Sequence, residues 1–162
     1  LATLLAGENS YLDLRGMGPE RIKRLAALGA PSPTPLHAMS LGELAALTWA
    51  AETLTQAQTL SSAGARVLPL DFDAFLRDPV ESTRRIFTHF GLEAPEGFFA
   101  QIPQSDVFTR YSKAPEHAYT PQLRAEILTQ SRARNAEEIR KGLAWLERAA
   151  AQAPALARLI SA

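Results

Sequence analysis

The chain has 162 residues, 46% of them hydrophobic and 21% charged, and it contains no cysteine. This composition is that of a globular protein with a core of its own, and it excludes disulfides, thiolate chemistry and cysteine zinc sites. The net charge is zero, but residues 1–104 carry a balance of −3 and residues 105–162 one of +3. The basic part suits either an anionic ligand or ordinary solvated helix faces. Since no dense Lys/Arg cluster occurs, we expect no nucleic-acid binding.

These totals predict a single cytoplasmic domain over residues 1–162. The longest apolar windows are far shorter than the roughly 18 residues that a membrane span needs, so no transmembrane segment is expected. The first residue is Leu1 rather than Met, and the chain opens directly on an apolar run. We therefore expect an N-terminally truncated portion of a larger domain.

Two helices are predicted between residues 18 and 62, and residues 1–6 suit the tail of another helix that ends at Gly7. The first opens at Gly18–Glu20, because Pro in the first turn and Glu beside it suit a helix N-terminus, and it ends at Gly29. A connector with three prolines follows over residues 30–39. The second helix begins at the capping box Ser40–Glu43 and runs to about residue 62.

The stretch that follows predicts a strand and two helical segments. Residues 66–71 form a short apolar run typical of a strand that is covered on both faces, although Pro69 restricts it to an edge or a strand end. Residues 72–76 predict one helical turn.

The next helix has the clearest local signals in the sequence. Asp78 is a favourable N-cap, Pro79 occupies the first helical position and Glu81 completes a capping box. Gly91 follows the helix at the position where a left-handed residue usually ends it.

A polar loop over residues 109–119 holds the first candidate site. Arg110, Ser112 and Lys113 bring two cations and a hydroxyl beside Tyr111, a combination that suits a phosphate clamp under a nucleotide base. The alternative is a surface loop anchored by its tyrosines.

A second basic patch lies in the last helical region, which begins near residue 120 and has a predicted break at Asn135. Arg140 and Lys141 suit either a phosphate or a solvated helix face, on which Glu137 would pair with Lys141 one turn further along. The three histidines share no spacing pattern, so neither a catalytic triad nor a metal site is predicted.

The order of these parts resembles the C-terminal half of bacterial-type sulfotransferases, which use 3′-phosphoadenosine 5′-phosphosulfate (PAPS). The resemblance is carried by residues 67–79 (VLPLDFDAFLRDP), 89–92 (HFGL) and 111–119 (YSKAPEHAY). It implies a P-loop-like α/β fold, mainly helical in this portion, with one short central strand near 66–71. It also implies PAPS as the co-substrate, an acceptor hydroxyl or amine, and no metal.

The resemblance further implies that Arg110, Ser112 and Lys113 are neighbours of the nucleotide, with Arg140 and Lys141 as additional ones. The family's phosphosulfate-binding loop has no counterpart in this sequence, so we expect the chain alone to be inactive and the intact protein to be an enzyme if it carries that loop. The catalytic base and the acceptor stay unassigned. The alternative function is a non-enzymatic, mainly helical interaction or scaffold domain, which would bury residues 67–70 under its helices.

Overall fold

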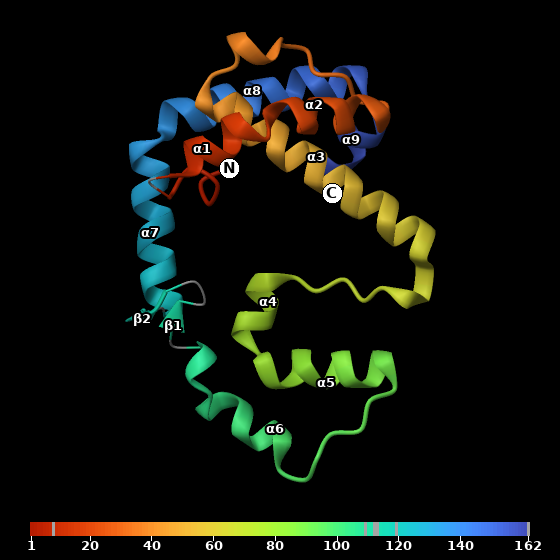
Figure 1. Cartoon of the computed structure of the whole chain (residues 1–162), viewed down its shortest axis with the longest axis vertical. Coiled ribbons are helices and arrows are strands. Elements are labelled where there is room, and N and C mark those ends of the chain that lie inside the picture. Colours follow the sequence, from red (N-terminus) through yellow and green to blue (C-terminus); the bar gives the residue numbers. More distant parts are fainter. Residues whose placement is uncertain (8, 109, 112–113, 119, 162) are drawn as a thin grey trace. The chain divides into compact units, whose positions relative to one another are not determined.

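The computed structural model describes residues 1–7, 9–108, 110–111, 114–118 and 120–161, and most of them are helical (Figure 1). The α-helices are α1 (Ser10–Gly16), α2 (Gly18–Ala27), α3 (Leu41–Ala63), α4 (Phe72–Arg77), α5 (Pro79–Phe90), α6 (Phe98–Gln101), α7 (Pro121–Arg134), α8 (Ala136–Gln152) and α9 (Pro154–Ile160). The 3-10 helices are η1 (Leu36–Ala38), η2 (Gly64–Arg66), η3 (Ile102–Gln104) and η4 (Asp106–Phe108), and the strands are β1 (Arg110–Tyr111) and β2 (Ala114–Ala118).

The predicted α/β class is wrong, because the described residues form an all-α arrangement. Their β structure is one short antiparallel hairpin, in which Arg110 of β1 lies opposite Ala118 of β2. The predicted strand near 66–71 does not form. Val67 has an extended backbone (φ −123°, ψ 127°), but no described segment pairs with residues 67–71. An extended segment becomes a strand only when a neighbour takes up its N–H and C=O groups, and Pro69 offers no N–H.

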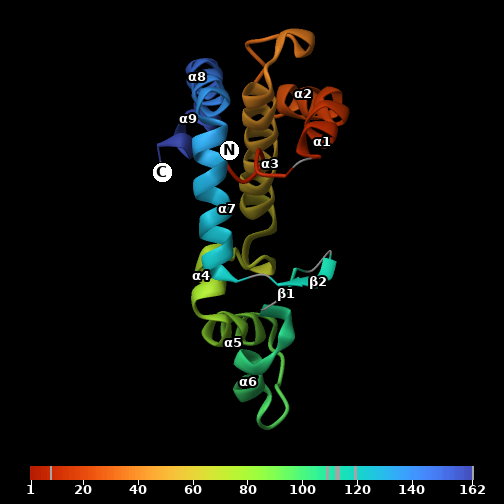
Figure 2. The ribbon, with the colours of Figure 1, turned by 90° about the vertical axis from the view of Figure 1, so that its left-hand side faces the viewer.

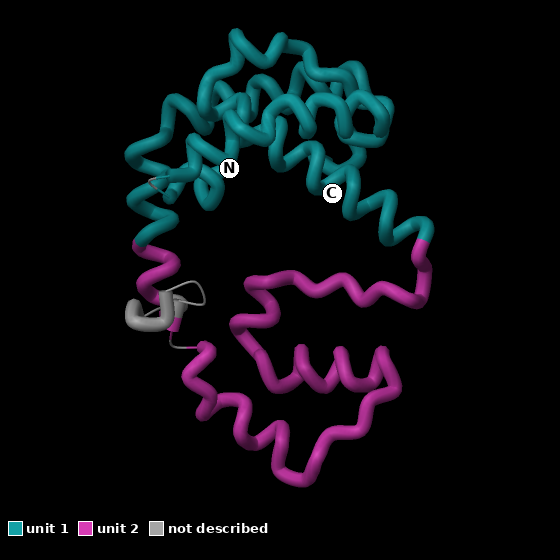
Figure 3. The backbone as a smooth tube through the Cα atoms, viewed as in Figure 1, with its two compact units in different colours: residues 1–62, 127–162 teal, residues 63–126 magenta. Residues whose placement is uncertain are grey.

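The chain divides into two compact units (Figure 3). Unit 1 comprises Leu1–Ser62 and Ile127–Ala162, and unit 2 comprises Ala63–Glu126. The helix α7 is shared, since residues 121–126 belong to unit 2 and the rest to unit 1.

Unit 1 is a stack of helices around one apolar core. In Figure 2, α3 lies between the α1–α2 pair and the α8–α9 pair. Side chains from all five helices are buried there, and the largest fully buried ones include Trp145, Leu14, Leu25, Leu47 and Leu156. Complete burial of each such leucine contributes about 1.5–3 kcal/mol to folding, so this core is the main source of unit 1's stability.

The helices α3 and α8 touch through two glycines. A Cβ atom on Gly42 would overlap the carbonyl oxygen of Glu138, and one on Gly142 would lie 2.5 Å from the carbonyl oxygen of Gly42. Two helix backbones approach this closely only where neither carries a side chain. The Gly42 amide also donates to the Glu138 carboxylate (2.7 Å), so α8 supplies a hydrogen-bond acceptor for the first turn of α3.

The capping box predicted for α3 is confirmed. Ser40 Oγ accepts a hydrogen bond from the Glu43 amide (3.2 Å), and the Ser40 amide donates to Glu43 Oε2 (2.9 Å). The predicted break at Asn135 is also confirmed, because α7 ends and α8 begins on either side of it. The Asn135 side chain fixes this corner by donating to the Leu5 carbonyl (3.2 Å) and to Ser131 Oγ (3.1 Å).

The helix α1 is absent from the sequence prediction. Its N-cap, Asn9, makes no side-chain capping bond, so the local signal for a helix start is missing. A partner from α2 holds it instead: Arg21, which is buried, donates from Nη2 to Asp13 Oδ2 (2.8 Å) and from Nη1 to the Asp13 carbonyl (3.1 Å).

In unit 2 the helix starts follow the sequence closely. Asp71 Oδ1 accepts from the Ala74 amide (2.7 Å) at the start of α4. Asp78 Oδ1 accepts from the Glu81 amide (3.0 Å) at the start of α5. The reciprocal bond of the predicted capping box is not made, because the Asp78 amide donates to the carbonyl of Ala74 (3.2 Å).

The end of α5 is also as predicted. Gly91 has a left-handed backbone (φ 62°, ψ 33°), and the Leu92 amide donates to the Phe87 carbonyl (2.8 Å). This is the six-to-one bond of a Schellman motif, in which glycine avoids the strain that a Cβ would cause.

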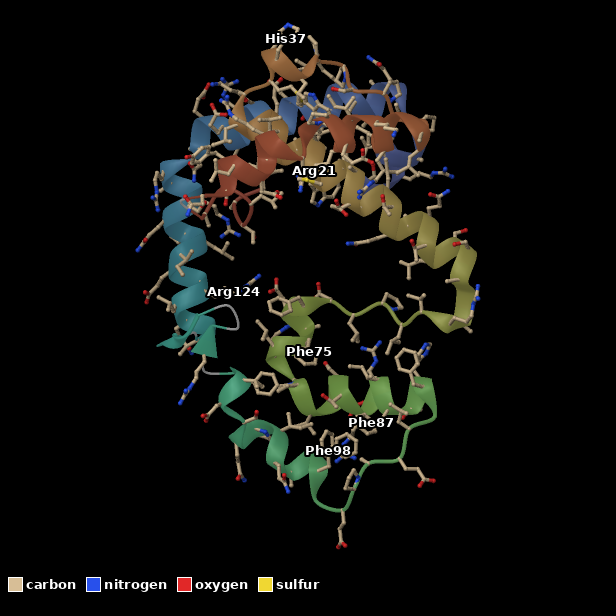
Figure 4. The ribbon with its side chains drawn as sticks, viewed as in Figure 1. Arg21, His37, Phe75, Phe87, Phe98 and Arg124 are labelled. Carbon is tan, nitrogen blue, oxygen red and sulfur yellow. The ribbon has the colours of Figure 1, made fainter. Side chains whose placement is uncertain are left out.

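Despite these well-formed ends, unit 2 has almost no core. Its main apolar contact is a cluster of Phe87, Phe98 and Phe99 with ring centroids 5.2–5.4 Å apart. Figure 4 shows Phe87 of α5 and Phe98 of α6 in this cluster. Among the unit 2 residues whose burial is described, Ser82 and Ile102 are the buried ones.

Candidate functional site

The first predicted site lies around the β1–β2 hairpin in unit 2. The Arg110 guanidinium lies 3.2 Å from Asp106 Oδ2, and both side chains are exposed. Such an exposed ion pair contributes little stability, because water screens both charges. Ser112 and Lys113, the other two members of the predicted clamp, lie outside the described residues.

The second predicted site lies on α8 in unit 1. Arg140 binds Glu137 through two hydrogen bonds, from Nε (3.0 Å) and from Nη2 (2.6 Å). Lys141 donates from Nζ to Glu138 Oε1 (2.7 Å). The predicted pairing of Glu137 with Lys141 is therefore wrong by one position: each cation takes the carboxylate three residues before it. Three and four residues are equivalent spacings on a helix surface, so the sequence alone does not choose between them.

Glu138 is the best-connected carboxylate of this patch. Burial by itself would raise its pKa, but hydrogen bonds from Lys141, from the Gly42 amide and from Ser40 outweigh burial and hold the pKa below the usual glutamate value. The same contact with Glu138 raises the pKa of Lys141. These contacts hold the first turn of α3 against α8, which is a structural role.

These contacts decide how the predicted residues fit a PAPS donor. Its phosphates and sulfate need several cations that converge on one point. Arg110 belongs to unit 2, whereas Arg140 and Lys141 belong to unit 1, and each of the three already contacts a carboxylate. An anionic donor that binds any of these three cations would therefore compete with the carboxylate already in contact with it.

Unit 2 contains a cation that the sequence analysis did not single out. Arg124 Nη1 lies 2.8 Å from Asp73 Oδ1, and its guanidinium lies 5.7 Å from the centroid of the Phe72 ring. The contact joins the first turn of α7 to the first turn of α4 across some 50 residues of sequence, and Arg124 is labelled in Figure 4. No spacing rule connects residues so far apart, so sequence reasoning had no signal for it.

A hollow of about 630 Å³ lies in unit 2 beside the aromatic cluster. It is lined by Thr83, Phe98, Gln101, Ile102, Gln104, Ser105, Val107 and Phe108. None of these lining residues is charged, so the hollow suits an apolar group better than a phosphate.

The remaining candidate chemistry is sparse. His37 is exposed and points outward in Figure 4, and the His89 ring lies edge-on against Phe90 with centroids 4.7 Å apart. In the part of the chain that the structure describes, no three His, Asp or Glu residues gather as metal ligands would. No helix among the same residues combines the length and the apolar character needed to cross a bilayer.

Comparisons with protein-family models, with curated proteins and with solved structures find no match to this chain.

Proposed function

We propose that the chain is part of a sulfotransferase that moves a sulfuryl group from PAPS to an acceptor hydroxyl or amine, and that it is inactive by itself. Two aspartate-capped helices followed by Gly91 and Leu92 form one part of the sequence that carries the resemblance, whereas the strand expected before them does not form. The sequence motif and its local geometry therefore agree from Asp71 to Leu92, which supports the proposal.

The observation that carries the proposal is the exposure of the apolar stretch that leads into α4 and ends at its first residue, Phe72. No residue of the run 67–72 is buried; Leu70 is 39% exposed and Phe72 is 58% exposed. Single exposed apolar side chains are ordinary, and unit 1 has them at Leu12 and Leu143. A mainly apolar stretch without one buried member is different, because it leaves a larger area of apolar surface in water. The run is what we expect of a chain whose motif contacts a surface that these residues do not supply.

This proposal assigns no catalytic step to a described residue. PAPS would supply the activated sulfuryl group, and transfer needs cations on the donor and a base at the acceptor. The role left for this chain is to hold the donor nucleotide through the loop at residues 110–113.

Calorimetric titration with 3′-phosphoadenosine 5′-phosphate (PAP) tests this role. We expect saturable binding at low salt that is lost in Lys113→Ala and in Ser112→Ala. Arg134→Ala, which removes an exposed cation of α7, is the matched control and should bind normally. A folded chain that takes up no PAP, or that binds equally well in all variants, would contradict the nucleotide role of residues 110–113.

The second candidate is a helical interaction or scaffold domain without enzymatic activity. The observation that favours it is unit 1, which buries a continuous core with its own helices. This candidate predicted that residues 67–70 are buried under the helices, but the structure buries none of them. It therefore requires that a second copy covers the run, and it predicts a folded chain that binds no PAP and self-associates there. Sedimentation of the wild type and of Phe72→Ser, with and without PAP, would separate the candidates. If PAP changes the sedimentation of the wild type, the enzyme is favoured. If the wild type associates, PAP does not change that association and Phe72→Ser abolishes it, the scaffold is favoured.

A further inference from the structure

Unit 1 has a groove at its surface where α2, α3 and α9 meet, three helices that can be followed in Figure 1. Its volume is about 420 Å³, within the range of about 300–1,000 Å³ that is usual for small-molecule sites. The apolar part of its lining is Ala27, Leu28, Leu54, Ala57, Ala155 and Leu159. Leu54 is a member of the core, and Leu28, Ala155 and Leu159 pack against it, so the floor of the groove is the outer surface of the core itself.

Two polar side chains complete the lining, one on each of two helices. Arg158 of α9 brings the only charge among the lining residues, and Gln58 of α3 brings an amide. Arg158 is exposed and forms no ion pair with a carboxylate in the described part of the chain, which is also true of Arg15, Arg132 and Arg134 in the same unit. An arginine that lacks an acid beside an apolar groove offers a planar pair of N–H donors to an anion.

We propose that this groove binds a free medium-chain fatty acid as its carboxylate. The alkyl chain would lie on the core residues, where it removes apolar surface from water. The carboxylate would lie at Arg158, whose fork geometry matches its two oxygens, with the Gln58 amide as a further donor.

The size and charge of the groove favour this ligand over a peptide or a phospholipid. A stable protein partner contacts roughly 20–30 residues on each side, whereas this groove is lined by eight. The single cation of the lining matches the one negative charge of a carboxylate, whereas a peptide or a phospholipid headgroup brings further polar groups for which the lining offers only Gln58. The site uses none of the residues assigned to PAP, so the two proposals stand or fall separately.

The test is titration calorimetry of the full chain with sodium decanoate, kept below the concentration at which it forms micelles, and with decanol. We expect one decanoate per chain, and decanol at least about tenfold weaker because it lacks the charge. Arg158→Gln should weaken the affinity for decanoate about tenfold and leave the affinity for decanol unchanged. Arg134→Gln, which removes another exposed arginine of unit 1, should change neither. Ala57→Leu places a larger side chain in the groove and should abolish both.

Three results would overturn the proposal: no saturable heat with decanoate, equal affinity for decanol, or equal losses in Arg158→Gln and Arg134→Gln. Circular dichroism establishes that each variant is folded. If Ala57→Leu fails to fold, the comparison of the two arginine variants still decides, because both substitutions are on the surface.

Discussion

Unit 1 and unit 2 obey the same local rules of helix formation, yet they differ in what they bury. Unit 1 has continuous helices, close glycine contacts and a core that includes a fully buried Trp145. Unit 2 has equally good helix caps at Asp71, Asp78 and Gly91 but leaves most of its apolar side chains partly exposed. Local signals decide where helices begin and end, whereas tertiary stability depends on the apolar surface that the elements remove from water. We therefore expect a segment with well-formed helix caps but almost no core to be stable only where its apolar side chains contact another surface.

The largest effect is expected when the same substitution, leucine to alanine, is made once in each unit. Leu47 of α3 is fully buried, whereas Leu70 is 39% exposed. Leu47→Ala should cost about 3 kcal/mol of unfolding free energy, because it removes buried methyl groups and leaves a cavity. Leu70→Ala should stay within about 0.5 kcal/mol. Urea denaturation followed by circular dichroism measures both. A comparable loss in Leu70→Ala would show that the run 67–72 is covered in solution, and the contrast between the units would fail.

The glycine contact between α3 and α8 gives the next test. Gly42→Ala should destabilise unit 1 by about 2 kcal/mol, because the new Cβ meets backbone atoms of Glu138 and the two helices must separate. Gly16→Ala is the matched control, since a Cβ there meets nothing within 4 Å. It should be neutral or slightly stabilising. Equal melting temperatures for the two variants would mean that α3 and α8 do not approach as closely as the structure shows.

A cap in unit 2 should matter locally and by less. Asp78→Ala removes the side-chain acceptor at the start of α5 and should cost about 1 kcal/mol, whereas Asp78→Asn keeps an acceptor oxygen and should cost little. Amide hydrogen exchange should become about fivefold faster along α5 and stay unchanged along α3. Acceleration in both helices would indicate that the two units open as one, against the contrast drawn above.

The sequence predicts the ends of several helices well, although the α/β class inferred from it is wrong. Ser40 with Glu43, Asp78 with Glu81 and Gly91 act on amides within a few residues, so their geometry follows from spacing alone. The strand near 66–71 is the main error. An apolar run of that length satisfies the local criteria for a strand, but a strand also needs a partner, and none is present among the described residues.

The candidate site was less predictable than the fold. The charges of Arg140 and Lys141 were visible in the sequence, but their engagement by Glu137 and Glu138 depends on side-chain direction on one helix turn. Arg124 and Arg158 were not singled out, because their significance comes from neighbours distant in sequence or from the lack of an acid nearby. Neither kind of information can be obtained from composition or from the spacing of residues in the sequence.

The smallest expected effect concerns the carboxylate that joins α3 to α8. The pKa of Glu138 is lower in the folded chain than the usual value of about 4.3 for an unfolded glutamate. A lowered folded-state pKa means that the ionised carboxylate stabilises the fold above about pH 4.3, and that this contribution is lost as the pH falls through the folded-state pKa. Glu138→Gln should therefore melt below the wild type at pH 7, and the difference in melting temperature should narrow as the pH falls from 7 to 3. Glu147→Gln, on the same helix but without contact to Gly42 or Lys141, measures the background effect of removing one carboxylate. A gap for Glu138→Gln that persists unchanged at pH 3 would assign the effect to packing of the side chain, and the core of unit 1 would then account for its stability without this ionic contact.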